Sequence, residues 1–157
     1  MDGGTGRVPR IVVGVDGSPA SEEALRWAVR HAALVGGTVD AVIAWEYPAS
    51  YGWPAPILEG FDFEDNARRC LAGAVTAVTG GTPDGDAPIR QLVVQGHPAA
   101  ALLDASEEAD VLVVGNRGHG GFTEALLGSV GQHCVHHGRC PVVVVRAARN
   151  EEAVKER

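Results

Sequence analysis

Cysteines, basic residues and long apolar runs are all scarce in this chain. It has 3 cysteines, an odd number without the regular spacing of a disulfide framework. We therefore expect free thiols and a reducing, cytoplasmic environment. The apolar runs are far shorter than a membrane-spanning helix, and the Gly-rich first ten residues contain no apolar stretch, so we expect no membrane association.

The charge balance is acidic. The sequence has 13 Lys and Arg and 20 Asp and Glu, which gives a net charge of −7. Such a chain repels phosphate backbones, so nucleic acid is not expected as a partner. Hydrophobic residues make up 45% and charged residues 21% of 157 residues, a composition typical of one globular domain. We expect a domain over 10–147, with a flexible tail at 1–9 and a charged tail at 148–157.

Several nucleotide-site motifs are also missing. The sequence has no Gly-Lys-Ser/Thr of a P-loop and no complete Gly-x-Gly-x-x-Gly after its first apolar run. A single acid, Asp16, follows that run, whereas a response-regulator receiver domain would need an acidic pair there. These three classes are therefore excluded.

Five strand-like runs alternate with helical patterns, which predicts a parallel sheet with helices on both faces. The runs are Ile11–Val15, Val39–Trp45, Ile89–Val94, Val111–Val114 and Val142–Val145. The first predicted helix starts at Pro19, after an N-cap Ser18, and ends before Gly36. The other three predicted helices cover Phe63–Val78, Pro98–Glu108 and Ser129–Gly138.

The most informative segment begins where the fourth strand ends. Glycines recur at Gly115 and Gly118, and Gly128-Ser129 opens the last helix. Glycines allow a ligand to approach the backbone, and a helix N-terminus offers unpaired N–H groups, so the segment predicts a phosphate site. The Ser129 hydroxyl could cap the helix or donate to a phosphate. A flexible Gly-rich loop with ordinary caps is the alternative interpretation.

Three charged or titratable residues have two interpretations each. Arg117 and His119 could add positive charge near a phosphate, or could simply be solvated. Asp16 could hold Mg²⁺ and polar ligand atoms, or could cap the helix that begins nearby. The pair His133 and His137 shares a helix face with metal-ligand spacing, but structural packing is the favoured interpretation there.

The pattern Gly115-x2-Gly118-x9-Gly128-Ser129 resembles the nucleotide-binding signature of the ATP-binding universal stress proteins. The opening run Ile11–Ser18 and the closing run Cys140–Arg146 resemble the same family. The resemblance implies a five-stranded parallel sheet in the order 3-2-1-4-5, with ATP and its Mg²⁺ across the carboxyl ends of the central strands. This agrees with the rule that open α/β sheets bind ligands where the strand order reverses.

The resemblance also implies the site residues. The base and ribose would lie near Gly14, Val15, Asp16, Ala44, Val114 and Gly115, and the phosphates near Gly118, Gly128, Ser129 and Val130. Gly131 departs from the pattern, because relatives often carry Ser or Thr there. A homodimer would form through the last strand, which contains Val142, Val143, Val144 and Val145.

Three functions remain open. The favoured one is an ATP-binding regulatory module in the stress response. The alternatives are a slow ATPase or phosphotransfer enzyme at the same site, and a dimeric scaffold that needs no nucleotide.

Overall fold

The computed structural model describes residues 6–47, 61–81, 87–117 and 127–147. Five strands form a sheet in the order β3-β2-β1-β4-β5, and all four neighbouring pairs are parallel. This confirms the predicted fold class and strand order. The elements are β1 (Arg10–Gly14), α1 (Pro19–Val35), β2 (Thr38–Trp45), α2 (Phe63–Thr79), β3 (Ile89–Gln95), α3 (Pro98–Ala105), β4 (Val111–Gly115), α4 (Ser129–His137) and β5 (Val142–Val145).

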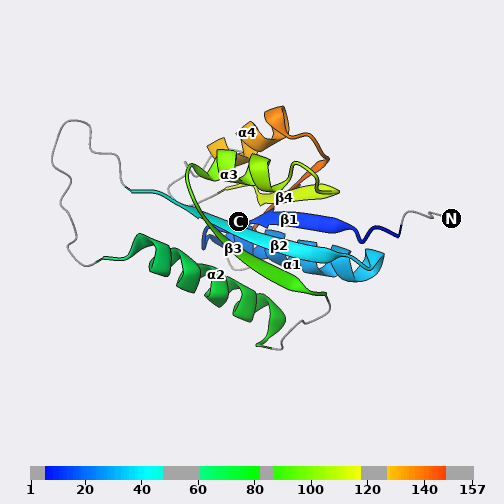
Figure 1. Ribbon diagram of the computed structural model, residues 1–157, viewed down its shortest axis with the longest axis horizontal. Coiled ribbons are helices and arrows are strands. Elements are labelled where there is room, and N and C mark those ends of the chain that lie inside the picture. The colour runs from blue at the N-terminus through cyan, green and yellow to red at the C-terminus, as the bar shows by residue number, and fades with distance from the viewer. Residues whose placement is uncertain (1–5, 48–60, 82–86, 118–126, 148–157) are drawn as a thin grey trace, which may run out of the picture.

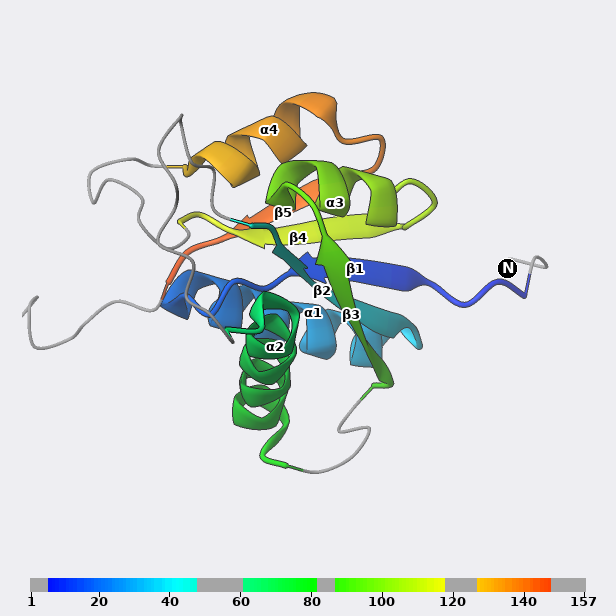
Figure 2. The same ribbon diagram turned by 60° about the vertical axis from the view of Figure 1, so that its left-hand side comes forward.

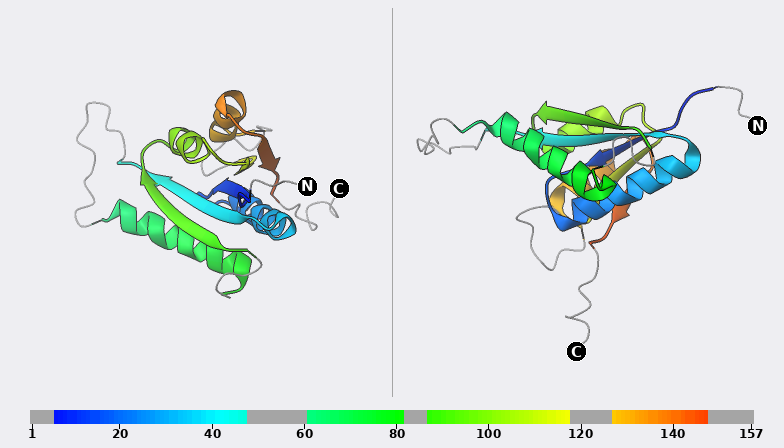
Figure 3. Two further views of the ribbon diagram at one scale, coloured as in Figure 1. Left: turned by 45° about the vertical axis from the view of Figure 1, so that its right-hand side comes forward. Right: turned by 90° about the horizontal axis from the view of Figure 1, so that it is seen from below.

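Helices cover both faces of the sheet. α1 and α2 lie on one face, and α3 and α4 on the other, as Figures 1 and 2 show. The right-hand view in Figure 3, seen from below, shows α1 and α2 in front of the strands. Successive strand residues point to opposite faces, so Val13 packs under α1 and α2, whereas Val12 packs under α3 and α4. None of the helices in the described ranges has the length and apolar character needed to cross a membrane.

The start of α1 follows the prediction. Ser18 is the N-cap, and its hydroxyl accepts a hydrogen bond from the Ser21 backbone N–H at 3.2 Å. Pro19 occupies the first helical position, where its missing N–H leaves no bond unmade. The helix ends at Gly36, whose φ of 68° is a left-handed conformation that glycine adopts without strain.

One predicted helix end is wrong. α3 ends at Ala105 and does not continue to Glu108. The Ser106 hydroxyl donates to the Leu103 carbonyl at 3.2 Å, and such side-chain bonds give the backbone an alternative to further helix. The other predicted ends differ from the observed ones by one residue or none.

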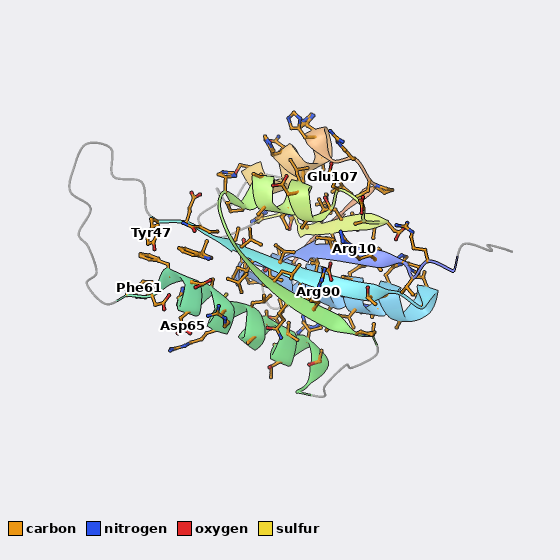
Figure 4. The ribbon with its side chains drawn as sticks, in the orientation of Figure 1. Arg10, Tyr47, Phe61, Asp65, Arg90 and Glu107 are labelled. Carbon is orange, nitrogen blue, oxygen red and sulfur yellow. The ribbon has the colours of Figure 1, made fainter. Side chains whose placement is uncertain are left out.

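An ion pair between a buried carboxylate and a largely exposed arginine joins β2 to β3. The Asp40 side chain is 5% exposed, and Arg90 donates to its carboxylate from Nε at 3.1 Å and from Nη2 at 2.8 Å. This hydrogen bond and charge raise the pKa of Arg90 above its ordinary value. Arg10 Nε lies 3.6 Å from the same carboxylate. Figure 4 shows Arg10 and Arg90 along the sheet, away from Tyr47 at the carboxyl end of β2, so this cluster stabilises the sheet and not the site described next.

Candidate functional site

A cavity of about 390 Å³ opens at the carboxyl edge of the sheet. Gly14, Ala44 and Gly115, from the ends of β1, β2 and β4, line it. The strand order reverses between β1 and β4, so the cavity lies at the switch point where open α/β sheets bind ligands. Its volume is within the range of small-molecule sites.

The cavity brings together ten of the residues predicted for the site. They are Gly14, Val15, Asp16, Ala44, Val114, Gly115, Arg117, Gly128, Ser129 and Val130. The remaining two, Gly118 and His119, lie outside the described residues.

Five lining residues were absent from the predicted set. They are Ser21, Val42, Pro98, Leu102 and Gly131. Val42 could have been found, because it precedes Ala44 by two residues and therefore shares its strand face. The two α3 residues, Pro98 and Leu102, carry no motif. Their position follows from packing: a Cβ on Gly14 would lie 2.7 Å from Leu102 Cδ1, so α3 rests directly on β1.

One end of the cavity is apolar and has main-chain groups directed into it. The Val15 N–H donates to the Val42 carbonyl at 2.8 Å, so the main-chain groups of Val42 point toward β1. Residues two apart in a strand point the same way. The N–H and C=O of Ala44 therefore face the space beyond Gly14, where β1 has ended. This end can hold a flat apolar ring and bind its polar edge.

Asp16 follows β1 and has two roles in the geometry. It lines the cavity, and its Oδ1 accepts a hydrogen bond from the Ser18 N–H at 2.8 Å. Its own N–H donates to Ser21 Oγ at 3.2 Å. Gly17, with φ of +85°, allows the chain to turn between them. The carboxylate thus fastens the β1–α1 turn at the wall of the cavity.

The two ends of the segment between β4 and α4 are joined by backbone bonds. The Asn116 N–H donates to the Val145 carbonyl at 2.8 Å, and the Asn116 carbonyl accepts from the Gly128 N–H at 2.7 Å. Ser18 Oγ donates to the Arg117 carbonyl at 3.3 Å. These contacts hold the base of the Gly-rich segment against β5 and against the start of α1.

The other end of the cavity is the N-terminus of α4. Gly128 is the N-cap and provides no side-chain cap, and Ser129 is the first helical residue. The capping role considered for the Ser129 hydroxyl is therefore not observed. The N–H groups of Ser129, Val130 and Gly131 are the first in the helix, so they have no acceptor within it. Together with the helix dipole they favour an anion at this end.

Besides Gly14, two lining glycines have close neighbours where a side chain would lie. A Cβ on Gly115 would lie 2.7 Å from the Ala20 carbonyl carbon, so this glycine allows α1 to contact β4. Packing thus requires glycine at this position whether or not a ligand approaches its backbone. A Cβ on Gly131 would lie 2.7 Å from Leu127 Cδ1. Leu127 therefore fills the space that a side chain at position 131 would need.

Metal ligands are few in the ranges that the structure covers. No group of three or more His, Cys, Asp or Glu side chains there could hold a metal ion. His133 and His137 pair on α4, with ring centroids 4.5 Å apart. Asp16 supplies the one carboxylate among the described residues that line the cavity, so a cation there would also need oxygen atoms that a ligand brings.

Sequence comparison agrees with this geometry. The model of the Universal stress protein family matches residues 8–146. The chain belongs to the universal stress protein family. A universal stress protein of Mycobacterium tuberculosis is 37% identical over 139 residues, which cover 87% of this chain and 45% of the relative. This chain thus spans less than half the length of such curated relatives.

Solved structures of the family share the fold. UspA from Lactobacillus plantarum superposes with a TM-score of 0.74 at 24% identity, covering 90% of this chain and 100% of that one. A universal stress protein crystallised in complex with cAMP has a TM-score of 0.57 at 28% identity, covering 90% of this chain and 98% of that one.

Proposed function

We propose that this universal stress protein binds ATP in the cavity and acts as a nucleotide-dependent regulatory module in the stress response. The observation that carries the proposal is the arrangement of the cavity, which has an apolar end with a main-chain donor and acceptor and an opposite end formed by an uncapped helix N-terminus. The three free cysteines fit a reducing compartment, so we place the protein in the cytoplasm.

The base end favours adenine over guanine. Ala44 directs one N–H donor and one C=O acceptor into the cavity. Adenine has an acceptor, N1, beside a donor, N6–H, so it matches this pair. Guanine carries a donor and an acceptor in the reverse order, which would oppose donor to donor and leave both sites unpaired. Val42 and Leu102 would cover the faces of the ring.

The phosphate end balances charge locally. The chain has a net charge of −7, so a triphosphate needs local donors. The first-turn N–H groups of α4, the Ser129 hydroxyl and Arg117 are the donors in the described part of the cavity. Gly118 and His119 are also proposed to lie near the phosphates, on the family resemblance alone.

Mg²⁺ would enter with the nucleotide. Proteins often hold Mg²⁺ through one or two carboxylates together with substrate phosphates, and Asp16 provides such a carboxylate in the cavity wall. The cation would neutralise the repulsion between Asp16 and the triphosphate.

The relative bound to cAMP supports an adenine nucleotide as the ligand class. That protein has a comparable length, since the match covers 98% of it, and it shares 28% of aligned residues with this chain.

The experiment has two steps. The purified protein is first denatured, and released nucleotide is identified by mass spectrometry. Nucleotide-free protein is then titrated with MgATP and MgGTP by calorimetry. We expect ATP to bind more tightly than GTP, by about tenfold or more, because each unpaired polar group costs about 1–3 kcal/mol.

A matched pair of variants tests the location. Ala44→Leu adds three carbons at the base end and should abolish ATP binding, whereas Ala100→Leu adds them to an exposed position on α3 and should not. Absence of ATP binding by the wild-type protein at millimolar concentration would refute the proposal. Equal binding by both variants would place the nucleotide elsewhere.

We also propose a homodimer through β5. This strand is at the edge of the sheet, with Val142, Val143, Val144 and Val145 in a row, and Val144 is 38% exposed. An apolar edge strand favours pairing with a second copy. Sedimentation equilibrium at micromolar protein should give a dimer, and Val144→Lys should give a monomer. A wild-type monomer would contradict this assembly.

A further inference from the structure

Ser18 does not line the cavity, yet it connects two of the segments that do. Its hydroxyl accepts from the Ser21 N–H at 3.2 Å and donates to the Arg117 carbonyl at 3.3 Å. Its own N–H donates to Asp16 Oδ1 at 2.8 Å. The residue is 5% exposed. One small residue thus joins the acidic turn after β1 to Arg117, the second residue after β4.

We propose that Ser18 is a positioning residue for the nucleotide phosphates, acting through the Arg117 carbonyl. The inference rests on the proposed function, because it assigns a new role at the same site. Ser18 itself would not contact the nucleotide. It would hold the start of the Gly-rich segment at the distance from α1 that the bound phosphates require.

Packing against β4 fixes the helix turn that Ser18 caps. The first turn of α1 packs on β4 so closely that a Cβ on Gly115 would lie 2.7 to 2.9 Å from three atoms of Ala20. Asn116, the next residue, is fixed by backbone bonds to Val145 and Gly128. The Arg117 carbonyl is therefore the first point of the segment that this backbone network does not fix, and Ser18 bonds to it.

On its other side, the β1–α1 turn borders a second cavity of about 190 Å³, which lies between the turn and α2 and is lined in part by Gly17, Ser18 and Cys70. The turn is held by its own hydrogen bonds: Asp16 Oδ1 accepts from the Ser18 N–H, and Ser21 Oγ donates to the Ser18 carbonyl at 3.0 Å. Ser18 therefore has a fixed place from which its hydroxyl can bond to the Arg117 carbonyl.

The experiment separates this role from helix capping. Ser18→Ala removes both the cap and the Arg117 bond, Ser18→Gly keeps a tolerable N-cap but loses the bond, and Ser18→Thr keeps a hydroxyl. Asp62→Ala is the matched control: Asp62 caps α2 by accepting from the Asp65 N–H at 3.0 Å, and it is not among the residues that line either cavity.

Affinities for ATP and adenosine are measured by calorimetry on all variants. We expect ATP affinity to fall about three- to tenfold in Ser18→Ala and Ser18→Gly, the equivalent of one hydrogen bond, with adenosine affinity unchanged. Ser18→Thr and Asp62→Ala should bind ATP like the wild type. Wild-type ATP affinity in Ser18→Gly, or an equal loss in Asp62→Ala, would overturn the positioning role.

Amide hydrogen exchange in the nucleotide-free protein gives a readout that does not depend on binding. The Gly128 N–H bonds to Asn116, so its exchange reports on the base of the segment. We expect it to accelerate about tenfold in Ser18→Ala and not in Asp62→Ala. If the wild type binds no ATP, the proposed function and the phosphate role both fail. If it binds ATP and Gly128 exchange is unchanged in Ser18→Ala, only the role of Ser18 fails.

Discussion

Three glycines differ in what an added methyl group would meet, and this difference predicts the order of stability of their alanine variants. A Cβ on Gly115 would lie 2.7 Å from the carbonyl carbon and 2.9 Å from the carbonyl oxygen of Ala20, which are backbone atoms of α1. A Cβ on Gly131 would lie 2.7 Å from Leu127 Cδ1, the tip of a flexible side chain. A Cβ on Gly73, within α2, would meet no atom within 4 Å among the described residues, its chain neighbours and the helix's own backbone apart.

The magnitudes follow from these contacts. Gly73→Ala should stabilise the protein by about 0.5–1 kcal/mol, because alanine loses less conformational entropy in a helix. Gly131→Ala has the same helical gain, but Leu127 must move, so we expect a net change between zero and a loss of about 1 kcal/mol. Gly115→Ala must displace the backbone of α1 and should cost about 1–3 kcal/mol or more.

Urea denaturation and thermal melting of the three variants give the order. For a chain of 157 residues, 1 kcal/mol corresponds to a shift in Tm of about 2–4 °C. Gly115→Ala should also weaken ATP binding, because it moves the start of α1 and with it Ser18. A Gly115→Ala protein as stable as the wild type, or a Gly73→Ala protein less stable than Gly115→Ala, would refute the reasoning from close contacts.

Three further predictions concern the core and the phosphate end. Asp40→Asn should lower the free energy of unfolding by about 1–2 kcal/mol in urea, because Arg90 loses its charged partner, and an unchanged value would show that the ion pair is unimportant. Burial raises the pKa of Cys134 to about 11, so the free energy of unfolding should fall as pH rises from about 9 toward 11, because the thiol of the unfolded chain loses its proton first. At pH 8, mass spectrometry should find Cys134 alkylated after the other two cysteines, and early labelling of Cys134 would contradict its burial. Ser129→Ala should weaken ATP binding about threefold by calorimetry and leave adenosine binding unchanged, whereas an equal loss for both would place the hydroxyl at the base end.

The sheet could be predicted because its signals are local. Each strand is a short apolar run, and burial on both faces removes the polar alternation that would otherwise obscure it. Ser18 and Pro19 indicated the start of α1, because a serine side chain caps a helix and proline has a fixed φ. Both effects depend only on neighbouring residues. The end of α3 was missed, because the side-chain bond of Ser106 competes with the helix in a way that residue type alone does not fix.

The same contrast holds at the cavity. The position of Gly128 and Ser129 in the cavity wall could be predicted from the glycine spacing, because the glycines lie between the end of β4 and the start of α4. The α3 wall could not be predicted, because the position of Leu102 depends on how closely α3 approaches Gly14 in three dimensions. The cap of α3 was also unexpected: His97 Nδ1 accepts from the Ala99 N–H at 3.2 Å, a role that histidine seldom has.

A crystal structure grown with excess MgATP tests the central claim most directly. We predict electron density for adenine beside the main chain of Ala44 and for the phosphates at the first turn of α4, next to Ser129. A cavity that remains without nucleotide under these conditions, or a nucleotide bound with its phosphates toward Ala44, would contradict the account.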